Sequence, residues 1–233
     1  MNIEEYRNND KERIASNIKR MNEDGVIFFD IYSAYIDEEA EIESGVTIFP
    51  NVIIKGKTRI SKNATIGLGT VIENSIIGEN ANIKTAYIYD SEIGKNTSVG
   101  PFAYIRPGSM VGDNCKVGDF VEIKNSTLGN ETKASHLAYI GDADLGNGVN
   151  VGCGVVFVNF DGDKKYRSTI EDDSFIGCNS NLVSPVKVGE GSYIAAGTTV
   201  TEDIPADALA IGRSRQTTKT EWVKKRKILR KDK

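Results

Sequence analysis

Residues 36–72 read IDEEAEIESGVTIFPNVIIKGKTRISKNATIGLGTVI, with an isoleucine at every sixth position. A step of six fits neither an amphipathic helix nor one long alternating strand. It is typical of a three-sided β-helix in which each side is one hexapeptide and the recurring aliphatic side chain points inward. Each coil buries its apolar side chains against the next coil, so the coils stabilise one another.

The same ladder continues through most of the chain, with an occasional step of five. Between Ile36 and Val200 the inward positions number 27, which makes nine coils of three. Further runs are Ile93, Val99, Ile105, Val111, Val117 and Ile123, then Ile170, Ile176, Leu182, Val188, Ile194 and Val200. Only Ala134 is a weak anchor. The expected fold class is therefore all-β, a parallel β-helix of hexapeptide repeats.

The corners of the prism have their own pattern. A glycine often follows the inward residue, as Gly67, Gly118 and Gly177 do. We expect these glycines where the backbone needs unusual angles. The small residues two places before an anchor are expected to pack inside the corners, and examples are Ala64, Thr97, Ser109 and Ser180.

One segment interrupts the ladder, because no anchor is predicted between Val151 and Ile170. Residues 157–169 are therefore expected to form a loop extruded from the solenoid, which either builds part of a site or is a tolerated decoration. Residues 1–35 lack the step of six and are expected to form a helical cap on the first coil. Residues 36–205 would be the repeat domain, and 206–233 a C-terminal extension.

Composition and charge narrow the class of protein. The net charge is −4, so nothing overall points to nucleic acid. The exception is the basic tail of residues 224–231, which is either a solvated terminus or a short basic helix that meets phosphates. The three cysteines favour a reducing cytoplasm over a disulfide framework. We expect no signal peptide, no membrane span and no bound metal, because no His/Cys cluster has ligand spacing.

His136 is the only histidine, and it lies beside the weak anchor Ala134. A lone histidine is often structural, but an imidazole is also suited to removing a proton from an amine near neutral pH. Arg106 and Lys124 are one 18-residue coil apart, so they should stack on one face and could hold a phosphate. Both could equally be solvated charges. Glu122 is a candidate to orient the imidazole, with an ordinary salt bridge as the alternative.

Several longer motifs accompany these residues. They are Gly100-Pro101-Phe102-Ala103 through Arg106-Pro107-Gly108, Gly118-Asp119-Phe120-Val121-Glu122-Ile123-Lys124, Lys133-Ala134-Ser135-His136-Leu137 with Tyr139-Ile140-Gly141-Asp142-Ala143, Asn150-Val151-Gly152-Cys153-Gly154, Asn159-Phe160-Asp161-Gly162 and Ala208-Leu209-Ala210-Ile211. From about residue 15 to Val223 the chain resembles the C-terminal acetyltransferase domain of the bifunctional bacterial N-acetylglucosamine-1-phosphate uridylyltransferase/glucosamine-1-phosphate N-acetyltransferase.

The resemblance implies a left-handed β-helix and a homotrimer with sites between subunits. It implies that His136 is the general base. It implies that the amino-sugar phosphate is bound by Arg106, Lys124, Tyr139 and Asn150. It implies that acetyl-CoA is bound by Cys153, Asn159, Phe160, Lys165, Cys178, Ala196 and Arg213. Phe160 stands where the family commonly has Tyr, and Cys178 where it commonly has Ser.

The function expected from this resemblance is transfer of acetyl from acetyl-CoA to the amine of glucosamine 1-phosphate, a step of cell wall biosynthesis. No uridylyltransferase activity is expected, since residues 1–35 contain no Gly-rich nucleotide loop, and a separate uridylyltransferase could be a partner. Two alternatives stay open. The acceptor could be another amino sugar or nucleotide sugar, or the chain could be a non-catalytic trimeric scaffold, because fold alone does not fix function.

Overall fold

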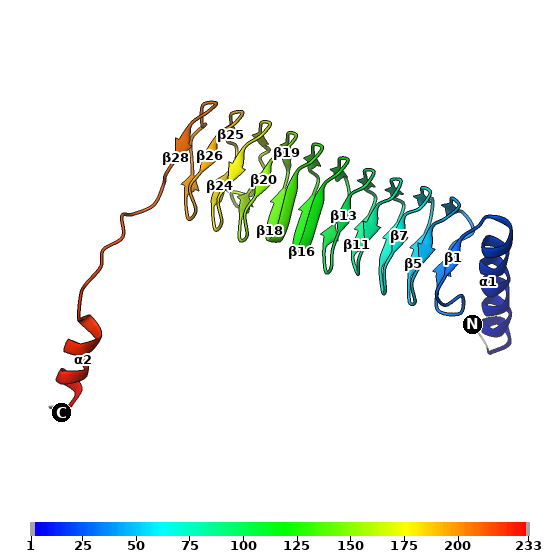
Figure 1. Ribbon diagram of the computed structural model, residues 1–233. Coiled ribbons are helices and arrows are strands. Elements are labelled where there is room, and N and C mark those ends of the chain that lie inside the picture. Colours follow the sequence, from blue (N-terminus) through cyan, green and yellow to red (C-terminus); the bar gives the residue numbers. More distant parts are fainter. Residues whose placement is uncertain (1–2, 232–233) are drawn as a thin grey trace.

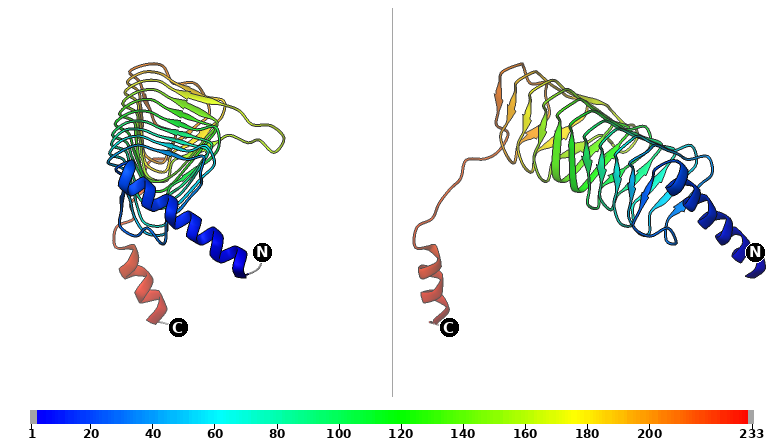
Figure 2. Two further views of the ribbon diagram at one scale, coloured as in Figure 1. Left: turned by 90° about the vertical axis from the view of Figure 1, so that its right-hand side faces the viewer. Right: turned by 45° about the vertical axis from the view of Figure 1, so that its right-hand side comes forward.

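The chain forms a three-sided parallel β-helix of about ten turns (Figure 1). The computed structural model describes residues 3–231, with side chains for 8–227. Seen from the N-terminal end, the coils stack into a prism of triangular outline, with one loop projecting from a corner (Figure 2, left). The strand pairs between neighbouring coils are parallel, as the ladder predicts.

The strands lie on three faces, here called face 1, face 2 and face 3. Face 1 contains β1 (Ile27–Phe28), β4 (Thr47–Ile48), β7 (Thr65–Ile66), β10 (Asn82–Ile83), β13 (Ser98–Val99), β20 (Asn150–Val151), β23 (Phe175–Ile176), β26 (Tyr193–Ile194) and β28 (Leu209–Ala210). Face 2 contains β2 (Tyr35–Ile36), β5 (Ile53–Lys55), β8 (Val71–Glu73), β11 (Tyr87–Tyr89), β14 (Tyr104–Ile105), β21 (Val156–Val158), β24 (Asn181–Val183) and β27 (Thr199–Val200). Face 3 contains β3 (Glu41–Ile42), β6 (Arg59–Ile60), β9 (Ile76–Ile77), β12 (Glu92–Ile93), β15 (Met110–Val111), β17 (Thr127–Leu128), β19 (Ala143–Leu145), β22 (Ser168–Ile170) and β25 (Lys187–Val188).

Two longer strands connect face 1 to face 2. They are β16 (Lys116–Lys124) and β18 (Lys133–Gly141), which pair with each other on both sides of the corner. Most other strands are only two or three residues long. At the corner itself the backbone turns through left-handed residues, Phe120 (φ 57°) in β16 and Leu137 (φ 31°) in β18.

The core is the column of anchors that the step of six predicts. Ile48, Ile66 and Ile123 are fully buried, and the weak anchor Ala134 also has no exposed surface. The small corner residues Ala64, Thr97, Ser109 and Ser180 are buried as well, which confirms the prediction for them. Burial of one aliphatic side chain contributes roughly 1.5–3 kcal/mol, so stability is spread along the whole stack.

The reason proposed for the glycines after the anchors was wrong at most of them. Gly67, Gly118 and Gly177 do not have positive φ; they sit where the next coil approaches closely. A Cβ built on Gly118, for example, would lie far inside contact distance of the Ser135 carbonyl oxygen. The left-handed angles fall later in the corner, often on asparagines such as Asn63 (φ 59°) and Asn179 (φ 55°). Asparagine tolerates this region better than most residues with a side chain.

The predicted gap in the ladder was wrong at its start. Phe157 is fully buried and lies in β21, six residues after Val151, so it is an anchor with an aromatic side chain. The extruded segment is thus shorter than expected and runs from residue 159 to 167, between β21 and β22. It folds as a small hairpin, closed by an antiparallel bridge between Phe160 and Lys165. This hairpin is the loop that projects from the prism in Figure 2.

The helical cap is present as α1 (Ile3–Glu23), which lies across the first coil (Figure 2). Its polar side chains bind carbonyl groups that no earlier coil could pair. Arg13 Nη1 donates to the Ala34 carbonyl (2.6 Å), buried Asn17 to the Ile31 and Ala34 carbonyls (2.9 and 3.0 Å), and Arg20 to the Asp37 carbonyl (3.0 Å). The cap therefore satisfies backbone polar groups at the edge of the solenoid as well as covering it.

Strand pairing extends past both expected ends of the repeat domain. β1 pairs with β4 before Ile36, and β28 pairs with β26 after residue 205, which accounts for about one turn beyond the predicted nine. After β28 an extended segment leads to the basic helix α2 (Trp222–Lys231), which lies apart from the prism (Figure 1). Neither α1 nor α2, as far as the described residues go, is long and apolar enough to cross a membrane.

Candidate active site

Strand β18 places His136 on the corner between faces 1 and 2, where its side chain is 61% exposed. In the parallel register with β16, Asp119 lies directly opposite it. His136 Nδ1 and Asp119 Oδ1 are 2.7 Å apart. This contact lowers the pKa of Asp119, chiefly through the hydrogen bond to the imidazole, so the carboxylate is ionised at neutral pH.

The prediction that Glu122 orients the imidazole was wrong. Glu122 lies on face 2, three residues further along β16, and its Oε1 accepts a hydrogen bond from Arg106 Nη1 at 2.7 Å. This ion pair raises the pKa of Arg106, mainly through the hydrogen bond that Arg106 donates to Glu122. A strand of this length turns residues 119 and 122 to different faces of the prism, so only Asp119 reaches the histidine.

The position of Asp119 decides which imidazole nitrogen can react. A carboxylate at Nδ1 favours the tautomer with the proton on Nδ1. Nε2 then carries the lone pair, and it belongs to an exposed side chain at the corner. The same pairing of a histidine with an orienting carboxylate occurs in enzymes that use histidine to deprotonate a nucleophile.

The predicted cation pair is confirmed as a stack on face 2. Arg106 and Lys124 follow the paired anchors Ile105 and Ile123, and the Arg106 amide donates to the Ile123 carbonyl at 2.8 Å. Lys165, from the extruded hairpin, contacts Lys124, and this neighbouring ammonium lowers the pKa of Lys165. Burial lowers the pKa of Lys124, but its contacts with Lys165 and Asp142 outweigh burial and raise it overall. Lys165 therefore lies with the cations expected at the sugar phosphate, not with the expected acetyl-CoA residues.

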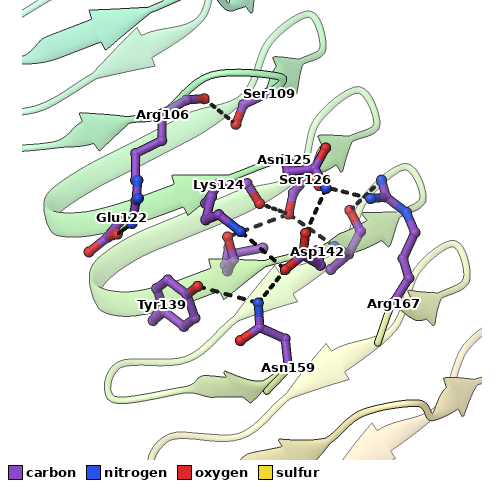
Figure 3. Close-up of polar contacts among 12 residues, drawn as sticks. Arg106, Ser109, Glu122, Lys124, Asn125, Ser126, Tyr139, Asp142, Asn159 and Arg167 are labelled. Atoms are coloured by element: carbon purple, nitrogen blue, oxygen red, sulfur yellow. Dashed lines mark hydrogen bonds and ion pairs between the residues drawn. The ribbon is translucent and has the colours of Figure 1, made fainter. Parts of the chain in front are cut away.

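A polar network joins this cation cluster to the root of the hairpin (Figure 3). Asp142 accepts hydrogen bonds from Lys124 Nζ (3.3 Å), Asn125 Nδ2 (2.6 Å) and Asn159 Nδ2 (2.5 Å). Asn159 is also 3.4 Å from the hydroxyl of Tyr139. Asn159, expected at the acetyl donor, thus contacts Tyr139, expected at the sugar.

Three of the residues expected at acetyl-CoA line up along the His136 corner. Cys153, Cys178 and Ala196 are each two residues after a face 1 anchor, as Asp119 and His136 are. Backbone hydrogen bonds of 2.8 Å link Asn179 to the Cys153 carbonyl and Gly197 to the Cys178 carbonyl, and all three side chains are exposed. The corner therefore forms a continuous row that begins at Asp119 and His136 and ends at Ala196.

Of the last two expected donor residues, Arg213 lies near the Ala196 end of this row, whereas Phe160 lies in the hairpin between β21 and β22. Arg213 follows the final strand and passes beside Gly197, since a Cβ built on that glycine would lie 3.6 Å from Arg213 Cδ. Phe160 is 53% exposed at the base of the hairpin. Arg167 fixes the other side of the hairpin by pairing with Asp144 and donating to the Asn125 carbonyl at 2.8 Å.

One chain does not bring all the expected residues into one pocket. His136 pairs with Asp119 of β16, and Lys124 lies five residues further along that strand. Five residues of extended strand span at most about 16 Å. Face 2 thus has the imidazole at one edge and the cations at the other. Asn150, expected at the sugar, lies on face 1 between Lys133 and Phe175.

Comparison with known proteins shows what this chain is similar to. Residues 90–125 and 167–202 match the family described as "Bacterial transferase hexapeptide (six repeats)". The chain is 52% identical over 203 residues to the bifunctional protein GlmU of Caldicellulosiruptor saccharolyticus, and 50% identical over 212 residues to that of Clostridioides difficile. This chain is a relative of bifunctional GlmU. The alignments cover 87% and 89% of it but only 44% and 46% of those proteins, so it spans a little under half their length.

Solved structures support the fold. A UDP-N-acetylglucosamine acyltransferase, LpxA of Bacteroides fragilis, is similar with a TM-score of 0.60 at 24% identity, over 78% of this chain and 70% of that one. The acyltransferase of Francisella novicida has a TM-score of 0.52 at 20% identity, over 86% and 73%. At these identities the likeness shows the shared β-helix alone.

Three residues with contacts in the candidate site or its hairpin, Asp119, Asp142 and Arg167, were not among the site residues expected from the sequence. Asp119 could have been found from the ladder, because the anchors Val117 and Ala134 pair and each is followed two residues later by Asp119 or His136. Asp142 could have been found in the same way, two residues after the anchor Ile140. No repeat position marks Arg167, since it belongs to the hairpin that departs from the repeat.

Proposed function

We propose that this GlmU relative transfers an acetyl group from acetyl-CoA to the amine of glucosamine 1-phosphate. The observation that carries the proposal is the contact between His136 and Asp119, at the head of the corner row that contains Cys153, Cys178 and Ala196. A base with a free nitrogen is what an amine needs to attack a thioester, and the row offers a long exposed track for the donor.

The cation cluster of Arg106, Lys124 and Lys165 supports a phosphorylated acceptor. The cluster has three cationic side chains and two carboxylates, Glu122 and Asp142. Its net charge is therefore positive, which favours binding of a phosphate. Arginine and lysine bind phosphate by charge-assisted hydrogen bonds. Tyr139 and Asn159 lie beside these cations and would contact the sugar.

In this mechanism acetyl-CoA supplies the thioester carbonyl. His136 Nε2 takes the proton that the acceptor amine loses as it attacks, and Asp119 stabilises the imidazolium that forms. The new bond joins the amine nitrogen to the acetyl carbon, the carbon–sulfur bond breaks, and the sulfur leaves as the CoA thiolate, which can take up the proton. Backbone N–H groups near Cys153 or Ala196 would stabilise the oxyanion.

We further propose that the working form is a homotrimer with each site shared between chains. Within one chain the register positions of His136 and Lys124 are five residues apart, at opposite edges of face 2. If the cation edge of face 2 of one chain packs against the corner row of a neighbouring chain, the cation cluster of the first chain comes close to His136 of the second. Asn150, on face 1, would then also line the shared site. Sedimentation of the intact chain tests the trimer directly.

The experiment that tests the function measures CoA thiol release with glucosamine 1-phosphate. His136→Ala should lower kcat by about 100-fold or more, the usual contribution of a general base. Lys187→Met, on face 3, should leave the rate unchanged. Turnover of the His136→Ala variant at the unaltered rate would exclude this mechanism.

A panel of acceptors tests the substrate. Glucosamine 1-phosphate should be preferred over glucosamine, because only the former engages the cations, and over nucleotide-linked amino sugars, whose diphosphate is bulkier. We place this chemistry in the cytoplasm, where both substrates would be found, in line with the three free cysteines.

A further inference from the structure

The carboxylate of Asp142 occupies the junction between face 2 and the extruded hairpin. It follows strand β18 with a left-handed backbone (φ 51°), and only 10% of its side chain is exposed. Asn125 lies one coil before it and Asn159 one coil after it, both two residues past an anchor of face 2. Figure 3 shows Asn125 and Asn159 on opposite sides of Asp142, with Lys124 and Tyr139 beside them.

Both carboxylate oxygens of Asp142 are engaged by donors. Oδ1 accepts from Asn125 Nδ2 at 2.6 Å, and Oδ2 accepts from Asn159 Nδ2 at 2.5 Å and from Lys124 Nζ at 3.3 Å. Burial raises the pKa of Asp142, but the hydrogen bonds from Asn125, Asn159 and Lys124 outweigh it, so the net pKa is lowered. The group is therefore an ionised acceptor at neutral pH.

The backbone of Asp142 is tied to the same two parts. Its amide donates to the Lys124 carbonyl at 2.9 Å, and its carbonyl accepts from the Ser168 amide, at the end of the hairpin, at 3.1 Å. The residue thus touches the strand that carries Lys124 and both roots of the hairpin that carries Lys165. Movement of either part changes the contacts of the other.

We propose that Asp142 is a positioning residue that holds the Lys124 ammonium for the acceptor phosphate and couples it, through Asn159, to the hairpin. The proposal rests on the proposed function, because it assigns the phosphate of that acceptor to Lys124. Asp142 does not itself meet the phosphate, which two negative charges would oppose. Its two oxygens accept hydrogen bonds from the neutral amides of Asn125 and Asn159. The ammonium of Lys124 donates one proton to Asp142 and can direct its remaining protons outward.

Asp142→Asn is the sharpest test because it preserves shape. The new amide can present an oxygen to one neighbour only, and its NH₂ group then opposes the donor of Lys124 or Asn159. We expect KM for glucosamine 1-phosphate to rise by about 10-fold, the effect of losing one charged hydrogen bond, while KM for acetyl-CoA changes by less than about 2-fold. Asp142→Glu keeps the charge and should recover part of the lost affinity.

The matched control is Asp144→Asn. Asp144 is two residues away and also anchors the hairpin, through Arg167, but it does not contact Lys124. If Asp142 only tethers the hairpin, the two variants will behave alike. If Asp142 positions Lys124, only Asp142→Asn will raise KM for the sugar phosphate. Assays are made at a temperature where circular dichroism shows each variant folded.

A double-mutant cycle isolates the contact. In a Lys124→Met background, Asp142→Asn should change KM for the sugar phosphate by less than about 2-fold, because the partner it positions is gone. If Asp142→Asn raises KM for the sugar phosphate by about 10-fold in both the wild-type and the Lys124→Met backgrounds, the proposal is overturned. It is also overturned if Asp142→Asn lowers kcat and raises the KM values of both substrates by the same factor.

Failure of the proposed function is separable from failure of this inference. Calorimetric titration of the intact chain with glucosamine 1-phosphate, with glucosamine as the control, measures phosphate recognition without turnover. If the chain binds the phosphate but transfers no acetyl group, the same variants test Asp142 by affinity. If it binds neither compound, both proposals are rejected.

Discussion

Asp119 and His136 are register partners in adjacent coils, and the carboxylate lies 2.7 Å from Nδ1 of the imidazole. Parallel strands with a fixed spacing hold the two side chains in this relation without any loop or ligand. The pairing makes the orientation of the only histidine a property of the solenoid itself.

Asp119→Asn should lower kcat by about 10- to 100-fold and leave KM for the sugar phosphate nearly unchanged, because the amide cannot stabilise an imidazolium and can reverse the tautomer. Steady-state kinetics with CoA thiol detection measures this. Glu122→Gln is the control, since Glu122 pairs with Arg106 and should alter KM more than kcat. If kcat falls in Glu122→Gln and not in Asp119→Asn, Glu122 and not Asp119 orients the imidazole of His136.

Lys124→Met and Lys165→Met should each raise KM for glucosamine 1-phosphate by about 10-fold, since each removes a cation from the phosphate cluster. Lys187→Met, which breaks only the ion pair with Glu171 on face 3, is the control. Turnover of unphosphorylated glucosamine, if measurable, should be insensitive to all three. If the lysine variants lose as much activity with glucosamine as with glucosamine 1-phosphate, the cation cluster does not recognise the phosphate of the acceptor.

Alkylation should distinguish the three cysteines. Cys153 and Cys178 are exposed in the corner row, whereas Cys115 is buried and burial raises the pKa of its thiol. Iodoacetamide should therefore modify Cys153 and Cys178 first and inhibit transfer, and acetyl-CoA should slow both events. The Cys153→Ala/Cys178→Ser variant should resist inhibition. Mass spectrometry that finds no protection by acetyl-CoA would argue against the donor track.

Phe157→Ala should destabilise the solenoid by about 3–5 kcal/mol, because the side chain is a fully buried anchor between β18 and β24. Phe160→Ala, three residues later and exposed, should change the free energy of unfolding by less than about 0.5 kcal/mol. Urea unfolding followed by circular dichroism compares the two. Similar losses would mean that the hairpin, and not the ladder, carries the stability there.

The contribution of Asp142 to stability should depend on pH in a defined direction. Its folded pKa is lowered from 3.8, so its stabilisation is complete above that value and is lost as pH falls through the folded pKa. The difference in unfolding midpoint between the wild-type chain and Asp142→Asn should therefore be largest near neutral pH and shrink below pH 3.8. A difference that grows on acidification would contradict this sign.

Most of the fold could be read from the ladder, and the misses have specific causes. Phe157 was not predicted as an anchor because it is aromatic in a ladder of aliphatic residues, although it lies six residues after Val151. The positions of the glycines were predicted, but the reason for them was not. At Gly118 a side chain would collide with the next coil, and the distance between coils cannot be read from a sequence. Left-handed coiling stays an expectation from the resemblance.

Less of the candidate site was predictable. Arg106 and Lys124 could be stacked by counting one coil, and the structure pairs them as counted. Glu122 was a candidate to orient the imidazole, but the outcome depends on where around the prism each side chain points, and the structure places Asp119 opposite His136. The hairpin contacts of Lys165 and Asn159 had no periodic signal at all.

The prism, its buried columns and the coil on which each outward residue lies all follow from the repeat of six, because it converts position along the chain into position in space. Which charges meet is a property of the folded chain. Hydrogen bonds act over about 3 Å, and a shift of one residue around a corner moves a side chain to another face. Asp119 therefore holds His136, and Asp142 joins Lys124 to the hairpin, through distances that spacing alone does not contain.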